Sequence, residues 1–276
     1  MTFSINVNAS ALSALQNLNA TSRDLEQTQT RINTGLRVSS AQENAAVFAI
    51  AQKLRGDLKG LNAVEQSLDR GISTVDVALA AATSISDLLL EMKEKAVAAA
   101  DQGLDSTSRT ALSLDFAALR DQISSIVQNA EFNGSNLIDS GSDAIVAITN
   151  ADATQTLTVG HQNITLGSAN IPITSGQLIS TFTSASAAVT DVNSAIDNLN
   201  AVLTRLGAGA NSLDQSRTFS SKLADVIEVG IGNLVDADLA KESATLQALQ
   251  VKQQLGIQAL SIANQSPQSI LSLFQG

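Results

Sequence analysis

The chain contains no cysteine, tryptophan or tyrosine among its 276 residues, and only two prolines and one histidine. The absence of cysteine excludes disulfide bonds and thiolate metal sites. A histidine-based catalytic triad or metal cluster would need partners for His161 without any thiol, so we interpret His161 as a turn residue. Because proline interrupts helices, its near absence permits long helices almost everywhere except at Pro172 and Pro267.

Basic residues are also few. The chain has 16 Lys and Arg against 26 Asp and Glu, a formal net charge of −10. This balance argues against nucleic-acid binding, which needs clustered basic side chains. The first residues have neither the basic nor the apolar region of a Sec signal peptide. No uninterrupted apolar run reaches 18 residues, so we expect no membrane span.

The apolar residues that are present make up 44% of the chain and are mostly Ala, Leu, Ile and Val. Such small and aliphatic side chains suit close helix-on-helix packing. An alternating three-and-four spacing, typical of coiled coils, recurs in several segments. In the second segment it predicts one helix over residues 44–100, which would be about 85 Å long at 1.5 Å per residue. In the first segment the spacing is interrupted by polar residues and runs through Leu15, Leu18, Ser22, Leu25, Gln29, Ile32 and Leu36.

The middle of the chain has a different composition. A third helical segment is expected to end near Asn133–Gly134, and residues 139–175 are then rich in Gly, Ser, Thr and Asn. Three short runs, 144–149, 156–159 and 164–166, have strand composition and predict one or two β-hairpins. Helical spacing returns from Val189, and Pro267 is expected to end the last helix. The fold class predicted is mainly α: an elongated antiparallel helical bundle or coiled coil with a small central β-hairpin region.

This pattern predicts a palindromic domain organisation. Residues 1–40 and 236–276 form terminal helices, residues 41–138 and 176–235 form a rod-like helical domain, and residues 139–175 form the hairpin insert. Each terminal segment has one weak apolar face. Full burial of its apolar side chains, at roughly 2 kcal/mol each, cannot offset the ordering of about forty residues at 1–2 kcal/mol each. We therefore expect both ends to require partner helices and to order on assembly.

Several separate motifs occur in order along the chain. Residues 31–46 read R-I-N-T-G-L-R-V-S-S-A-Q-E-N-A-A, residues 131–138 read E-F-N-G-S-N-L-I, and the C-terminal stretch 255–274 includes I-A-N-Q-S-P-Q-S-I-L-S-L-F. Together they resemble the signatures of the bacterial flagellins, of a short type with a small central insert. The signature residues are Arg31, Gly35, Leu36, Arg37, Ser40, Asn44, Ala45, Phe132, Asn133 and Gly134.

The resemblance implies a structural subunit that polymerises into the flagellar filament for swimming motility. Its terminal helices would form the filament core as a coiled coil, and the protein would be extracellular after type III flagellar export. Its partners would be other copies of itself, the export apparatus, an export chaperone, and hook-junction and cap proteins. The expected subunit-interface residues are Leu15, Leu18, Leu25, Ile32, Leu36, Leu246, Leu249, Leu260, Leu271 and Phe274.

Other function classes remain to be compared with this one. A hook–filament junction protein would share the flagellin-like ends without forming long polymers. A soluble coiled-coil adaptor would bind another protein's helix. No convergent set of catalytic or cofactor-binding residues is present in the sequence, so we expect no enzyme activity, no cofactor and no metal.

Overall fold

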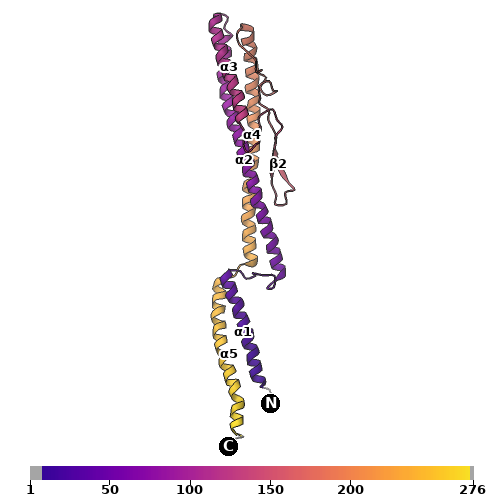
Figure 1. The fold of residues 1–276 in the computed structure, drawn as a ribbon, viewed down its shortest axis with the longest axis vertical. Helices are drawn as coiled ribbons and strands as arrows, with labels where there is room; N and C mark the ends of the chain where they lie inside the picture. Colours follow the sequence, from indigo (N-terminus) through magenta and orange to yellow (C-terminus); the bar gives the residue numbers. More distant parts are fainter. Residues whose placement is uncertain (1–7, 274–276) are drawn as a thin grey trace. The chain divides into compact units, whose positions relative to one another are not determined.

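The computed structural model describes the backbone of residues 8–273 and the side chains of residues 8–265. In this range the helices are α1 (Ala9–Thr34), α2 (Ala45–Ala99), α3 (Ser106–Asn129), α4 (Phe182–Val235) and α5 (Leu239–Leu273), and the strands are β1 (Ile145–Ile148) and β2 (Thr156–Val159). Figure 1 shows the strands as a minor part of a helical protein. The predicted mainly α fold class with a small β-hairpin is therefore confirmed.

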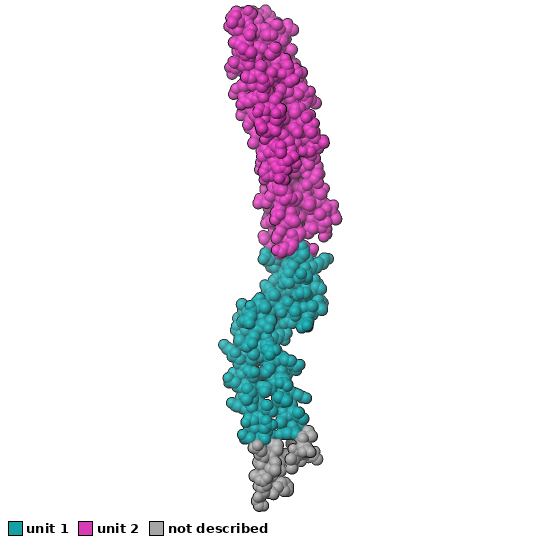
Figure 2. Space-filling model, viewed as in Figure 1, with its two compact units in different colours: residues 1–56, 227–276 teal, residues 57–226 magenta. Residues whose placement is uncertain are grey.

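The chain divides into two compact units, which Figure 2 shows in different colours. Unit 1 consists of residues 1–56 and 227–276, and unit 2 consists of residues 57–226. The division falls within α2 and α4, so each of these helices contributes residues to both units. Unit 1 otherwise holds α1 and α5, whereas unit 2 holds α3 and the hairpin.

The core of unit 2 lies where α2, α3 and α4 pack together. The fully buried side chains of this core include Leu68, Ile85, Leu89 and Met92 of α2 and Leu199 of α4, and the largest of them is Phe116 of α3. One window of α2 has a mean hydropathy of 1.4, which by length and composition alone would suffice to cross a membrane. Because its Ile85, Leu89 and Met92 side chains are fully buried in this core, the apolar character of α2 is explained by helix packing.

The insert between α3 and α4 also belongs to unit 2. Its strands pair antiparallel, with Ile145 opposite Val159 and Ile148 opposite Thr156. The predicted third strand at residues 164–166 is wrong: Asn163 accepts hydrogen bonds from the N–H and hydroxyl of Thr165, and Gly167 follows with φ +78°. These local bonds turn the backbone away from an extended path. The expected end of the third helix near Asn133 is also too late, since α3 ends at Asn129.

Glycines on the helices allow the insert to approach closely. A Cβ atom at Gly60 would lie 2.7 Å from the Cβ of Ala151, and one at Gly209 would lie 2.8 Å from Cγ1 of Val159. Real Cβ atoms essentially never approach neighbours so closely, so these positions require glycine.

Pro267 does not end the last helix, contrary to expectation, because α5 continues to Leu273. Proline removes one N–H donor but leaves the remaining helical hydrogen bonds available. By contrast, Gly35 ends α1 in a left-handed conformation with φ 70°, and Asp105 caps α3 by accepting from the N–H groups of Thr107 and Ser108.

Candidate assembly surface

Helices α1 and α5 lie side by side and antiparallel in unit 1 (Figure 1). The amide of Asn8 donates to the carbonyl of Ala263 over 2.8 Å, near one end of the pair. Near the other end Arg31 Nη1 lies 3.3 Å from Glu242 Oε1. A Cβ at Gly256 would lie 3.2 Å from Cδ1 of Leu18, which places Leu18 in the space that the glycine leaves.

Burial along the two helices follows a heptad pattern. Between these ends, the buried and half-buried positions of α5 are Glu242, Leu246, Leu249, Gln253, Gly256, Leu260 and Ala263. A matching set on α1 is Ala11, Ala14, Leu18, Thr21, Leu25, Thr28 and Ile32. Alternating steps of three and four are the signature of a coiled-coil seam. The two terminal helices of one chain therefore form an antiparallel coiled coil with each other.

The predicted α1 seam is correct at Leu18, Leu25 and Ile32 and wrong at Leu15 and Gln29. Ser22, also predicted, is half-buried, and its hydroxyl accepts from Nε2 of Gln253 in α5 at a distance of 3.5 Å. Ala14, Thr21 and Thr28 occupy the intervening seam positions, whereas Leu15 is 42% exposed and Gln29 is exposed. Small side chains at these positions allow the helices to approach closely, and that gain outweighs the larger apolar surface of Leu15. A search for large apolar residues alone misses such positions.

The interface residues expected from the sequence differ in how far the single chain buries them. Leu249 is buried within the single chain, Leu15 is exposed, and Phe274 and the side chain of Leu271 lie outside the described residues. The remaining predicted residues are half-buried: Leu18, Leu25, Ile32, Leu36, Leu246 and Leu260.

A second apolar face of the pair remains exposed, and most of it was not singled out from the sequence. Val251, Leu255 and Ile262 of α5 are 55%, 58% and 69% exposed. Their spacing of four and seven residues places them along one side of the helix, away from the seam. Leu12 and Leu15 are likewise exposed on α1. We use the name outer apolar face for these five apolar side chains, three on α5 and two on α1, which the seam leaves exposed. The signal for them in the sequence was that α1 and α5 carry more apolar residues than one seam accommodates.

The family-signature residues Gly35, Leu36 and Arg37 pair the two segments that join the helices of unit 1. Leu36 forms an isolated antiparallel bridge with Asp236. The N–H of Arg37 donates to the carbonyl of Val235, and its Nη2 donates to the carbonyl of Leu234; the donor–acceptor distance is 2.6 Å in both hydrogen bonds. The N–H of Ala237 donates to the carbonyl of Gly35 over 2.8 Å. These backbone contacts fix the chain's path between α1 and α2 against its path between α4 and α5.

Arg31 and Glu43 organise the charged part of this region. Arg31 Nε lies 3.8 Å from Glu43 Oε1, and its Nη1 reaches Glu242. Burial raises the pKa of the Glu43 carboxyl. Several contacts lower this pKa by more: hydrogen bonds from the N–H and hydroxyl of Ser39 and from the side chain of Gln27, and the positive charge of Arg31. The pKa of Glu43 therefore lies below its ordinary value of 4.5, and the carboxylate is held charged.

The other signature residues act as turns and caps. The carbonyl of Ser40 accepts a hydrogen bond from the N–H of Glu43 at a distance of 3.2 Å. Helix α2 begins at Ala45, and the Asn44 side chain caps it by accepting from the N–H of Val47 at 3.1 Å. In the F-N-G motif Phe132 exchanges backbone hydrogen bonds with Ser135. Asn133 and Gly134 have φ values of 51° and 84°, as a tight type I′ turn requires.

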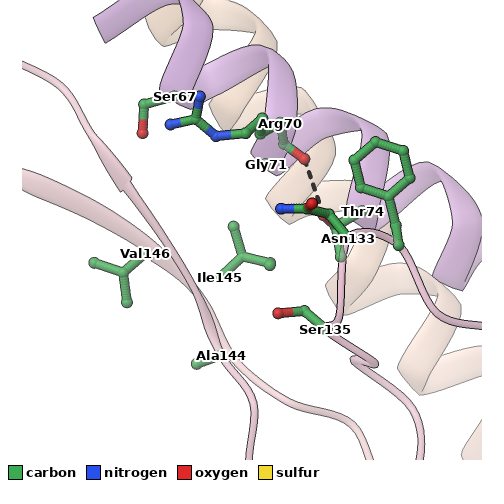
Figure 3. Close-up of a pocket in the computed structure, with 10 residues that line it drawn as sticks. Ser67, Arg70, Gly71, Thr74, Asn133, Ser135, Ala144, Ile145 and Val146 are labelled. Carbon is green, nitrogen blue, oxygen red and sulfur yellow. Dashed lines mark hydrogen bonds between the residues drawn. The ribbon is translucent and has the colours of Figure 1, made fainter. Parts of the chain in front are cut away.

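The described residues contain no group of three or more metal-ligating His, Asp or Glu side chains. His161 has Asp139 as a neighbour, with Nε2 3.3 Å from Oδ1. A pocket of about 310 Å³ lies between α2 and the insert (Figure 3). Its hydroxyls are engaged in structure: Thr74 donates to the carbonyl of Arg70 and Ser67 accepts from the N–H of Ile148. The pocket is thus part of the packing between insert and helix.

Comparison with known proteins agrees with this architecture. The family model for the bacterial flagellin N-terminal helical region matches residues 5–143, and that for the C-terminal helical region matches residues 189–274. The chain belongs to the bacterial flagellin family. The expected function, a structural subunit of the flagellar filament, is confirmed by this membership, and flagellins are structural proteins rather than enzymes.

Relatives of flagellin type match the chain along its full length. Flagellin FljM of Caulobacter vibrioides is 49% identical over 278 residues, covering 99% of this chain and 98% of that protein. A flagellin of Brucella melitensis is 40% identical over 282 residues, covering 99% of each. The crystal structure of Bacillus cereus flagellin covers 56% of this chain and 88% of its own, with a TM-score of 0.50 and 22% identity, a similarity of fold.

Proposed function

We propose that the chain polymerises through the outer apolar face of its α1–α5 coiled coil, which packs against the same pair of helices in neighbouring subunits. The observation that carries this proposal is the presence of two apolar faces on α5. One face forms the seam with α1, and the other exposes Val251, Leu255 and Ile262 to solvent. Contiguous apolar surface on a helix favours burial against a partner.

Energetics within the single chain support the need for such a partner. Among the described residues of α1 and α5, Thr28 and Leu249 alone are buried. A two-helix contact with so little full burial gains little apolar stabilisation against the entropy of ordering both helices. Covering the five half-exposed side chains of the outer apolar face would contribute about 1 kcal/mol each. Assembly would thus stabilise the fold of the termini and the polymer together.

The domain organisation gains a functional meaning in this proposal. Residues 1–40 and 236–276 would form the filament core, residues 41–138 and 176–235 the surrounding rod, and residues 139–175 the outer insert. The subunit interface would also include the seam residues that were expected from the sequence. The net charge of −10 would keep free subunits apart until salt screens their repulsion.

Membership of the flagellin family supports further proposals on location and partners. The filament is an extracellular structure, so the chain would leave the cell through the flagellar export apparatus. An export chaperone would cover the C-terminal helix before assembly. Hook-junction and cap proteins would contact the first and last subunits of the filament.

Seeded polymerisation tests the assembly surface directly. Purified chain, a precipitating salt and short filament seeds are mixed, and growth is followed by electron microscopy and sedimentation. Val251 in α5 and Val146 in the insert are matched, at 55% and 56% exposed. We expect Val251→Lys to prevent growth, because an unpaired charge buried at an interface costs several kcal/mol. Val146→Lys should grow like the wild type, with both variants retaining the helical circular dichroism of the parent.

Growth of the Val251→Lys variant at the wild-type rate would refute the proposed surface. A wild-type chain that only adds short caps to the seeds would instead indicate a hook–filament junction protein. A chain that never elongates but binds a helix of another protein would indicate a coiled-coil adaptor.

A further inference from the structure

The seam between α1 and α5 divides the exposed surface of the helix pair into two sides. Successive residues of an α-helix are turned by about 100° around its axis. The residue before a seam position and the residue after it therefore lie on opposite sides of the seam. On α1, for example, Ser13 and Leu15 flank the seam residue Ala14 in this way.

The side that carries Ser13 is hollowed. A groove of about 530 Å³ runs between the two helices on this side. Most of its lining residues directly precede seam positions, and the others belong to the seam itself. They are Ser10, Ser13, Ala14 and Asn17 of α1 and Leu255, Gly256, Ala259 and Ala263 of α5. All of them except Leu255 and Asn17 have very small side chains, which is why the space between the helices stays open.

The opposite side carries a ridge of three large apolar side chains. Leu12, Leu15 and Ile257 directly follow seam positions, and they are 52%, 42% and 55% exposed. None of the three lines the groove. Because Leu18 lies against Gly256 in the seam, Leu15 of α1 and Ile257 of α5 are at nearly the same height on the pair. The ridge and the groove thus occupy the same length of the two helices.

This length of the helix pair carries no charge. The sequence has no charged residue from Ala9 to Ser22 in α1 or from Gln253 to Gln265 in α5. Two copies of a chain with a net charge of −10 repel each other elsewhere. Contact between them at this height would bury no ionised side chain, which is the costliest kind of group to remove from water. The ridge and the groove are therefore suited to a partner that is equally acidic, namely a second copy of the chain.

We infer that the ridge of one copy inserts into the groove of a second copy. This inference rests on the proposed function and names the two complementary sides through which the helix pairs meet. The ridge side chains would occupy the space between the small groove residues, as knobs occupy holes between helices. They would also cover Leu255, which is 58% exposed at the groove.

The placement of ridge and groove on opposite sides of the pair determines the kind of assembly. A copy that is bound through its ridge still presents a free groove, so another copy can be added in the same way. Such a contact is heterologous, and it produces a ring or an open helical polymer rather than a closed dimer.

The absence of cysteine allows the contact to be detected by disulfide bonds between chains. Leu15→Cys places a thiol on the ridge, and Ala259→Cys places one in the groove. Seeded filaments are grown from each variant alone and from an equal mixture, oxidised, and separated on non-reducing gels. We expect disulfide dimers in the mixed filaments only, because ridge meets groove and neither side meets itself. Leu12→Cys, one turn away on the ridge, is mixed with Ala259→Cys in the same way.

Filling the groove tests the contact without a cross-link. Ala259→Phe adds a large side chain at an exposed position, so the single chain should keep its helical circular dichroism while elongation is lost. Leu15→Ala shortens the ridge and should slow elongation by itself. In the same chain, however, it should partly restore the elongation of Ala259→Phe, because a shorter ridge fits a filled groove and residues in contact are not additive. Ala201→Phe, at an exposed alanine of α4 in unit 2, is the control and should elongate like the wild type.

Dimers in filaments of Leu15→Cys alone would overturn the inference, since the ridge would then meet another ridge. The absence of dimers from both mixtures would do so too, as would wild-type growth of Ala259→Phe or a double variant that grows no better than Ala259→Phe. If the wild type elongates, each of these results rejects the ridge and groove contact and leaves the proposed function standing. A wild-type chain that does not elongate rejects both.

Discussion

The substitution Gly60→Ala tests whether the insert is firmly packed on α2. Replacing glycine by alanine inside a helix ordinarily stabilises it by about 1 kcal/mol. At Gly60, however, the new Cβ would lie 2.7 Å from Cβ and 2.9 Å from the carbonyl oxygen of Ala151. Relief requires backbone movement in a turn where Asn150 accepts from the N–H of Gln155 and donates to Thr154. Overpacking of this kind costs about 1–3 kcal/mol.

Gly207→Ala is the matched control for this experiment. Gly207 also lies inside a helix of unit 2, and a Cβ there would meet nothing within 4 Å. We expect Gly207→Ala to stabilise the protein and Gly60→Ala to be about 1–3 kcal/mol less stable than that control. The assay is urea unfolding followed by far-UV circular dichroism. Equal stability of the two variants would refute the packed insert.

A second glycine repeats the test from α4. Gly209 lies two positions from the control, but its Cβ would lie 2.8 Å from Cγ1 of Val159, which is stiff and buried on β2. Gly209→Ala should therefore also fall below Gly207→Ala in stability. If Gly60→Ala and Gly209→Ala are both destabilising while the control is not, the insert is held by both helices.

Two further predictions concern the core and the charged region. Phe116→Ala should destabilise unit 2 by about 3–5 kcal/mol in the same assay, because it opens a cavity in the core. The control is Phe219→Ala, which removes a side chain that is 64% exposed and should change stability by less than about 0.5 kcal/mol. Because the pKa of Glu43 is lowered in the folded chain, its stabilisation is present above the ordinary value of 4.5 and is lost as the pH falls through the folded pKa. Glu43→Gln should accordingly lose less stability than the wild type between neutral and acidic pH, measured by amide hydrogen exchange of residues 35–43. An identical pH dependence in both proteins would contradict this assignment.

Much of the helical organisation was predictable from local patterns. The three-and-four spacing in a proline-free stretch predicted the whole of α2, because a sustained apolar seam at helical period leaves few alternatives. The Asp105 cap and the αL position at Gly35 follow from side-chain and backbone preferences that act over a few residues. The strands at residues 145–148 and 156–159 were predictable in the same way, from β-branched runs separated by turn residues.

Other features depend on partners that are distant in sequence. Whether Leu15 or Ala14 faces α5 depends on how closely the two helices approach, because closely packed helix backbones leave room only for small side chains between them. The need for glycine at residues 60 and 209 appears only when Ala151 and Val159 are placed against the helices. From the sequence alone Pro267 predicts the end of a helix, yet α5 continues past it. The carbonyl of Ala263, which has no N–H partner at Pro267, accepts a hydrogen bond from the Asn8 side chain instead.

The sequence by itself determined the helices, the hairpin and the flagellin family, because periodicity, caps and signature motifs are local properties of the chain. The tertiary structure alone decided which face of each terminal helix is covered by its own chain. That choice depends on contacts between α1 and α5, whose residues lie at opposite ends of the sequence. Burying one face leaves Val251, Leu255 and Ile262 exposed, and the exposed face is where the physical argument for assembly begins.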